Sequence, residues 1–251
     1  MANWALEPFT SFGDYVEDAH RSMMLSINGI RRVESIVPLS EAVHNRNILD
    51  MTSEEARESE KRLDDTRKMA DFARREIDRG FPFIHSYTLV GTWGAFEAAV
   101  EDLAVTVLLN DPSTRSAESL SKIRGNLLEF ESMDIEDRTR FVVYELQRNL
   151  KAEDRLGVNV FEGVLSAIGL GGSVDGSTRK LMLEYQQLRH VIVHRGSVAD
   201  KQLVERCPWL GLKIGQKILL NHDDFHRLTK AMADYLGSIL DRVRKKFPSE
   251  K

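Results

Sequence analysis

Apolar residues recur at helical spacing along most of the chain, and this pattern predicts a series of amphipathic helices. The first is expected over residues 14–36. A second begins where Thr52-Ser-Glu-Glu55 fits a capping box, and it continues to about Arg79. Acidic and basic residues alternate along this second segment around a narrow apolar stripe, which is typical of a long solvated helix.

Gly80 and Pro82 interrupt the helical pattern and separate two parts of different character. The part before them carries many charges of both signs. The part after them opens with a mostly apolar helix, expected over residues 84–109. We therefore predict an acidic, mixed-charge helical arm over residues 1–80 and a core domain over residues 81–251.

The core domain is predicted to be helical throughout. Asp111-Pro112 is typical of a helix start, and Asn221 to Asp224 are expected to cap the last helix. Leu212–Leu220 is the one short segment expected to be extended, so the predicted fold class is all-α. The remaining core helices are expected near residues 116–130, 134–150, 160–168 and 175–195, with Gly196 as the C′ residue of the last of these.

Composition limits the class of protein. The 251 residues are 42% hydrophobic and 29% charged, which indicates a globular chain long enough to bury a core. No apolar stretch approaches the length of a transmembrane helix, and the N-terminal residues lack the apolar region of a secretory signal. Cys207 is the only cysteine, which excludes an intrachain disulfide and a cysteine zinc cage. We expect a cytoplasmic protein that does not enter a membrane.

The charge is distributed unevenly along the chain. Residues 179–251 hold 15 basic and 8 acidic residues, whereas the whole chain has a net charge of −4. A solvated surface with charges scattered by chance accounts for this difference. On the charges alone we prefer this first interpretation. The second is a binding face for a polyanion, because phosphate contacts depend on local positive charge.

A glycine-rich segment over residues 169–178 has some features of a phosphate-binding loop. The pattern of such loops requires a lysine, and Ser177 stands in that place. We therefore expect an ordinary flexible loop here.

The segment LRHVIVHRG, Leu188 to Gly196, concentrates titratable residues at the end of a predicted helix. His190 and His194 share a helix face, as do His222 and His226, so a four-histidine metal site is one reading. The glutamate of the HExxH motif is absent, and we expect no metal. Basic residues near a helix C-terminus also interact favourably with the helix dipole, so the group can be a structural feature of the helix end.

The same segment resembles the signature of the HEPN superfamily, a group of all-α domains found in ribonuclease toxins and phage-defence proteins. In that signature an arginine is followed by a polar residue and, four to six positions after the arginine, by a histidine. Arg189 matches the arginine, His190 the polar residue and His194 the histidine. The helix containing GTWGAFEAAVEDLA resembles the early HEPN helix, in which Glu97 matches an acidic residue near the motif. The resemblance covers residues of about 84–245.

The resemblance implies a HEPN-like helical bundle with an N-terminal helical extension, and a metal-independent endoribonuclease that needs no cofactor. In such an enzyme the RNA 2′-OH attacks the adjacent phosphorus. His194 suits the proton transfers, because histidine titrates near neutrality. Arg189 suits the phosphorane charge, because a guanidinium binds phosphate through two hydrogen bonds. His190 is expected to orient the phosphate, and Glu97 is expected to support Arg189.

Helix geometry raises a difficulty for this site within one chain. Five residues on a regular helix rotate by about 140°, so Arg189 and His194 do not point the same way. Fraying of the helix before Gly196 removes the conflict. A homodimer removes it too, and HEPN ribonucleases are generally dimers whose motifs face each other across the interface.

The expected partners are RNA, a second copy of the chain and, from the family, an antitoxin or other neutralising protein. Two alternatives remain open. One is a non-catalytic HEPN domain that binds RNA, a nucleotide or a protein, since fold alone does not give function. The other is a helical interaction protein that binds its partner through residues 1–80.

Overall fold

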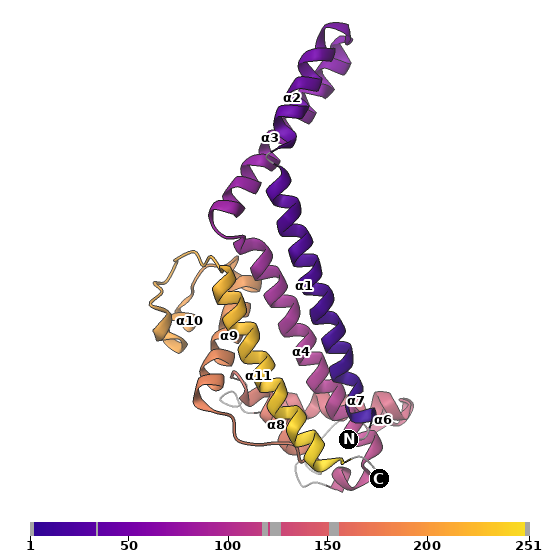
Figure 1. Ribbon diagram of the computed structural model, residues 1–251. Coiled ribbons are helices and arrows are strands. Elements are labelled where there is room, and N and C mark those ends of the chain that lie inside the picture. Colours follow the sequence, from indigo (N-terminus) through magenta and orange to yellow (C-terminus); the bar gives the residue numbers. More distant parts are fainter. Residues whose placement is uncertain (1–2, 34, 117–119, 121–126, 151–155, 249–251) are drawn as a thin grey trace. The chain divides into compact units, whose positions relative to one another are not determined.

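The fold is all-α, as the sequence predicts. The computed structural model describes residues 3–33, 35–116, 120, 127–150 and 156–248, and these residues form α-helices joined by loops and short 3₁₀ helices (Figure 1). The one β-type pairing among them is an isolated antiparallel bridge between Val198 and Lys217. None of the described helices combines the length and the apolar character that crossing a membrane requires.

The helices match most of the predicted segments. In chain order the elements are η1 (Asn3–Ala5), α1 (Glu7–Val33), α2 (Ile36–Asn47), η2 (Ile48–Asp50), α3 (Ser53–Asp78), α4 (Pro82–Asn110), η3 (Pro112–Ser116), α6 (Leu127–Ser132), α7 (Ile135–Arg148), α8 (Asn159–Ala167), α9 (Gly176–Arg195), α10 (Lys201–Arg206), η5 (Pro208–Leu210) and α11 (His222–Lys246). Most of the helix expected over residues 116–130 falls outside the described residues. The sequence did not predict α2 or α10.

The chain divides into two compact units. One comprises Met1–Glu17, Leu89–Ile218 and His226–Lys251, and the other comprises Asp18–Thr88 and Leu219–Phe225. Helices α1, α4 and α11 contribute residues to both. The predicted division into an arm over residues 1–80 and a core domain over residues 81–251 stays a prediction. The two compact units are defined by contacts within the fold, and such units need not be domains that fold independently.

In the smaller unit, α2 and α3 pack against each other as a helical hairpin (Figure 1). The predicted capping box starts α3: the Glu55 N–H donates to the Thr52 hydroxyl, and the Thr52 N–H donates to the Glu55 carboxylate. The ion pair between Arg67 and Glu41, at 2.8 Å, joins the two helices. No side chain of α2 is fully buried, so little of its stability comes from packing.

Aromatic side chains form the core of the larger unit. Helices α4, α8, α9 and α11 each contribute at least one ring, and ring centroids of neighbouring residues lie 4.9–6.1 Å apart. Such contacts add to the free energy that burial of the rings already supplies. The core aromatic residues, all at most 4% exposed, are Trp93, Phe96, Phe161, Tyr185 and Tyr235.

Two polar contacts fix helix α9 within this core. The Tyr185 hydroxyl donates a hydrogen bond of 2.9 Å to the Leu89 carbonyl of α4. The Glu184 carboxylate, 1% exposed, accepts hydrogen bonds from the Trp209 indole at 2.8 Å and from the Arg227 guanidinium at 2.5 Å. Because a buried charge without partners is strongly destabilising, these contacts determine both the depth and the rotation of α9.

Glu162 anchors the glycine-rich segment. Its carboxylate accepts hydrogen bonds from the Tyr235 hydroxyl, the Arg242 guanidinium and the Gly172 N–H. Arg242 also donates to the Leu170 carbonyl at 3.2 Å. The segment is a loop without a phosphate-binding lysine, as predicted, and it is held in place by this ion pair between α8 and α11.

Helix α9 ends at the predicted residue. Gly196 takes the left-handed conformation, with φ 57° and ψ 40°, and its N–H donates to the Val191 carbonyl. The Lys217 ammonium donates a hydrogen bond of 2.6 Å to the Gly196 carbonyl. The segment predicted to be extended thus lies against the end of α9, although it forms a single bridge and not a strand.

The conformation of Gly196 gives a stability prediction. A Cβ atom at Gly196 would meet nothing within 4 Å, so Gly196→Ala changes only the backbone preference. We expect a loss of about 1 kcal/mol in the free energy of unfolding, because the left-handed conformation is unfavourable for alanine. Gly237, exposed within α11 with equally open surroundings, is the matched control. Gly237→Ala should stabilise the protein by up to about 1 kcal/mol. Urea denaturation measures the free energy of unfolding of both variants. Equal changes in the two variants would contradict the left-handed conformation of Gly196.

Candidate functional site

The three motif residues lie in the last two turns of α9. The helix stays regular through Arg195 and ends at Gly196, so it does not fray before the glycine. Arg189 and His194 are therefore separated by a rotation of about 140° around the helix axis. Arg189 and His190 are half-buried, whereas His194 is exposed. A site that uses both Arg189 and His194 cannot be built on one face of this helix.

Arg189 and His190 line a polar pocket of about 280 Å³ in the larger unit. Residues of α4, α9 and α10 form most of its wall. The side chains include two guanidinium groups, three carboxamides, an imidazole, an indole and one carboxylate. The lining residues are Trp93, Glu97, Leu156, Gln186, Gln187, Arg189, His190, Gln202 and Arg206.

Arg189 has an unsatisfied hydrogen-bond donor in this pocket. Its Nε atom is buried, and no described residue forms a hydrogen bond with it. Within the described part of the chain, Arg189 forms no ion pair within 4 Å. A buried charged donor without a partner costs at least about 1–3 kcal/mol, so such groups usually have a missing ligand or a functional reason. A phosphate oxygen is a suitable acceptor for this N–H.

Glu97 lies in the same pocket as Arg189, as expected for a supporting residue. Burial raises the pKa of the Glu97 carboxyl, and the Trp93 indole and the Arg189 charge only partly oppose this effect. The two side chains thus interact through their charges, without a direct ion pair. A carboxyl with a raised pKa beside an unpaired guanidinium is an arrangement common at functional sites.

Sequence reasoning missed the second guanidinium of the pocket. Arg206, at the end of α10, donates a hydrogen bond of 3.4 Å to the Gln187 carboxamide oxygen. Gln202 donates to the same oxygen at 3.0 Å. Gln187 is 3% exposed, so its position is fixed by packing. The excess of basic residues after residue 179 was the one signal in the sequence, and it did not single out Arg206.

His190 connects the pocket to His194. The His190 and His194 rings lie 4.9 Å apart between centroids, with an interplanar angle of 48°. His190 faces the pocket, and His194 lies outside it. The structure therefore brings together Arg189, His190 and Glu97, and it leaves His194 on the adjoining exposed surface.

The alternative reading as a histidine metal site finds no matching group of ligands. Among the residues that the structure describes, no group of three His, Cys, Asp or Glu side chains lies close enough to hold a metal ion. His222 instead packs 5.7 Å from the His85 ring within the smaller unit.

Comparison with known proteins identifies no relative of this chain from which a function could be proposed. The sequence matches no family model, and no curated protein or solved structure matches it significantly.

The raised pKa of Glu97 predicts a dependence of stability on pH. The folded protein favours the protonated carboxyl, so this contribution is present at low pH and is lost as pH rises through the folded pKa. Glu97→Gln mimics the protonated form. The melting temperature of the variant relative to wild type should therefore increase between about pH 4 and about pH 7.

The control is Glu205→Gln, which replaces an exposed carboxylate on α10. Its melting temperature relative to wild type should not follow this trend. A relative melting temperature of Glu97→Gln that stays constant, or falls, between the two pH values would show that burial does not dominate at Glu97.

Proposed function

We propose that the chain is a metal-independent endoribonuclease of the HEPN type, which acts in toxin–antitoxin or antiphage defence. The observation that carries this proposal is the buried, unpartnered Nε of Arg189 in a polar pocket that contains a second guanidinium, Arg206. Two guanidinium groups that line one pocket are suited to a phosphodiester. The biological setting follows from the resemblance of the motif to the HEPN signature.

The proposed reaction is an internal transesterification. The 2′-oxygen of the RNA attacks the adjacent phosphorus, and the bond from phosphorus to the 5′-oxygen breaks. A base removes the proton of the 2′-OH, and an acid supplies one to the departing 5′-oxygen. The products are a 2′,3′-cyclic phosphate and a free 5′-OH, so no metal-bound water is required.

Each residue of the site has a separate role in this scheme. Arg189 and Arg206 hold the phosphate and stabilise the charge of the phosphorane. His190, at the edge of the pocket, orients a phosphate oxygen. His194 transfers a proton, because histidine is the side chain best suited to that work near neutral pH. Glu97 supports Arg189 from the same pocket and does not transfer a proton.

In this proposal, His194 acts at the pocket of a second copy of the chain. His194 is exposed outside the pocket, and the regular geometry of α9 directs it away from Arg189. In a homodimer joined near the ends of the two α9 helices, Arg189 of one copy and His194 of the other can meet at one phosphate. A symmetric interface then produces two equivalent composite sites.

A non-catalytic domain that binds RNA or nucleotides is the second candidate. The observation in its favour is that His194 does not line the pocket. In that case Arg189 and Arg206 bind a phosphate, and His194 has no role.

Single substitutions separate these two functions. Arg189→Ala should lower the rate of RNA cleavage by about 100-fold or more, because it removes a donor to the phosphorane. His194→Ala should lower the rate by about 100-fold or more through loss of proton transfer, while RNA binding is retained. Gel assays with a labelled oligoribonucleotide measure cleavage, and fluorescence anisotropy measures binding.

Lys180→Ala is the control, because Lys180 is an exposed basic residue near the start of the same helix, away from the end at which the two copies are proposed to join. It should change the cleavage rate by no more than about threefold. Cleavage by His194→Ala at the wild-type rate would remove the catalytic role of this residue and leave the binding function.

The substrate distinguishes this mechanism from metal-assisted hydrolysis. A single 2′-deoxy substitution at the scissile nucleotide should abolish cleavage, because the nucleophile is missing. Excess EDTA should leave the rate unchanged. An enzyme that activates water with a metal ion would show the opposite pattern, losing activity in EDTA and accepting the deoxy substrate.

A further inference from the structure

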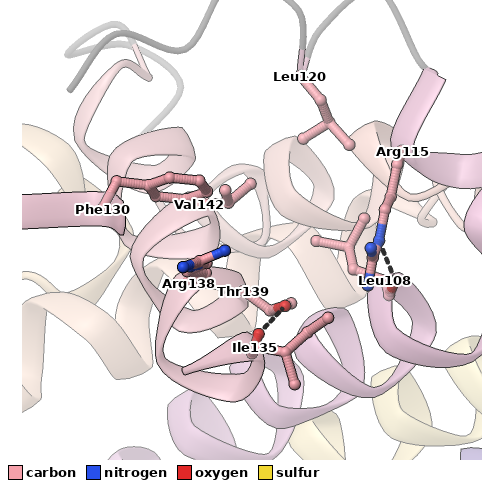
Figure 2. A pocket seen from close by; sticks show the side chains of 8 residues that line it. All are labelled: Leu108, Arg115, Leu120, Phe130, Ile135, Arg138, Thr139 and Val142. Carbon is pink, nitrogen blue, oxygen red and sulfur yellow. Dashed lines mark hydrogen bonds between the residues drawn. The ribbon is translucent and has the colours of Figure 1, made fainter. Parts of the chain in front are cut away.

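A second pocket, of about 350 Å³, lies between the end of α4, η3, α6 and α7 (Figure 2). It shares no lining residue with the Arg189 pocket. Its volume falls at the lower end of the range for small-molecule sites. The lining residues are Leu108, Arg115, Leu120, Phe130, Ile135, Arg138, Thr139 and Val142.

Arg138 supplies an unsatisfied donor to this pocket. One terminal nitrogen of its guanidinium donates a hydrogen bond of 2.7 Å to the Glu131 carbonyl, and the group lies 5.5 Å from the centroid of the Phe130 ring. The Nε atom is buried and has no hydrogen-bond partner among the residues that the structure describes. The contact with Phe130 does not compensate for this, because the Nε–H lies in the plane of the guanidinium whereas the ring interacts with the cation through its face.

Arg115 lies across the pocket from Arg138 (Figure 2). Its Nε donates a hydrogen bond of 2.7 Å to the Leu108 carbonyl, which fixes the direction of the side chain. No carboxylate is among the lining residues, and within the described part of the chain neither Arg115 nor Arg138 forms an ion pair. Among the described residues of the wall, no acidic side chain balances these two positive charges.

The rest of the wall is mostly apolar. Leu108 is 2% exposed at the base, whereas Ile135 is 64% exposed, so apolar surface extends from the interior to the solvent. Val142 and Leu120 also line the pocket (Figure 2). The Thr139 hydroxyl donates to the Ile135 carbonyl, so it can act toward a ligand only as an acceptor.

We propose that this pocket binds a small amphipathic anion: an apolar chain or ring with one carboxylate or phosphate group. The anionic group accepts hydrogen bonds from Arg138 and Arg115, and the apolar body packs against Leu108, Phe130 and Val142. Charge-assisted hydrogen bonds give the pocket its preference for an anion, and burial of the apolar body supplies the remaining affinity. The proposal is independent of RNA cleavage.

Calorimetric titration with four simple compounds tests the chemistry. Octanoate and octyl phosphate represent the two anionic groups on the same chain, octanol lacks the charge, and inorganic phosphate lacks the chain. At least one of the two octyl anions should bind to saturation, and the tighter of them identifies the anionic group. Octanol and inorganic phosphate should each bind at least about tenfold more weakly than that anion. Equal binding of octanol, or no saturable binding of either octyl anion, would overturn the proposal.

Substitutions locate the binding to this pocket. Arg138→Met keeps the length and the apolar stem of the side chain and should weaken binding of the preferred anion by about tenfold or more. Arg140→Met is the control, because Arg140 lies on the same helix and pairs with Asp102 and Glu136 at the surface. It should change the affinity by no more than about twofold. Unchanged affinity in Arg138→Met would also overturn the proposal.

Circular dichroism establishes beforehand that the variants are folded. If Arg138→Met does not fold, Arg115→Met replaces it with the same expected loss of affinity, and unchanged affinity in that variant would contradict the assignment equally well.

Discussion

The regular geometry of helix α9 is the constraint on which the candidate site depends. The helix is held along its length: Asp175 caps its start, Tyr185 bonds to the backbone of α4, and Glu184 lies buried between Trp209 and Arg227. These contacts prevent α9 from rotating, since rotation would expose an apolar face and leave a charge buried without partners. Because the helix does not unwind before Gly196, Arg189 faces a pocket and His194 faces solvent.

The pocket of Arg189 is electrostatically unfavourable in the isolated chain. It holds a buried guanidinium nitrogen without a partner, a second arginine, and a carboxyl whose pKa burial raises. The unpartnered nitrogen and the buried carboxylate each lower stability in the absence of a ligand. A phosphate would accept hydrogen bonds from the two guanidinium groups. Its binding would therefore offset the loss of stability that the unpartnered nitrogen causes in the free protein. This is the physical reason why we propose RNA as the ligand of this pocket, and the resemblance of the motif to the HEPN signature is the basis of the proposed reaction.

The sequence predicted the local features of the fold and not the contacts between distant segments. The capping box at Thr52 and the C-cap at Gly196 depend on a few neighbouring residues, and both are confirmed. Helix α2 was missed because it has no buried stripe to reveal it. Arg206 was missed for a different reason. It lines the Arg189 pocket only because the chain turns back and packs α10 against α9, and no spacing along the chain encodes that approach.

The central claim is that Arg189 and His194 act together from two different copies of the chain. The most direct test mixes Arg189→Ala and His194→Ala protomers, each inactive alone, after unfolding and refolding them together. A mixed dimer contains one site with both residues intact, so an equimolar mixture should recover about one quarter of the wild-type cleavage rate. If both residues act within one copy, or if the chain is a monomer, the mixture will remain as inactive as the two variants, and that result would contradict the account.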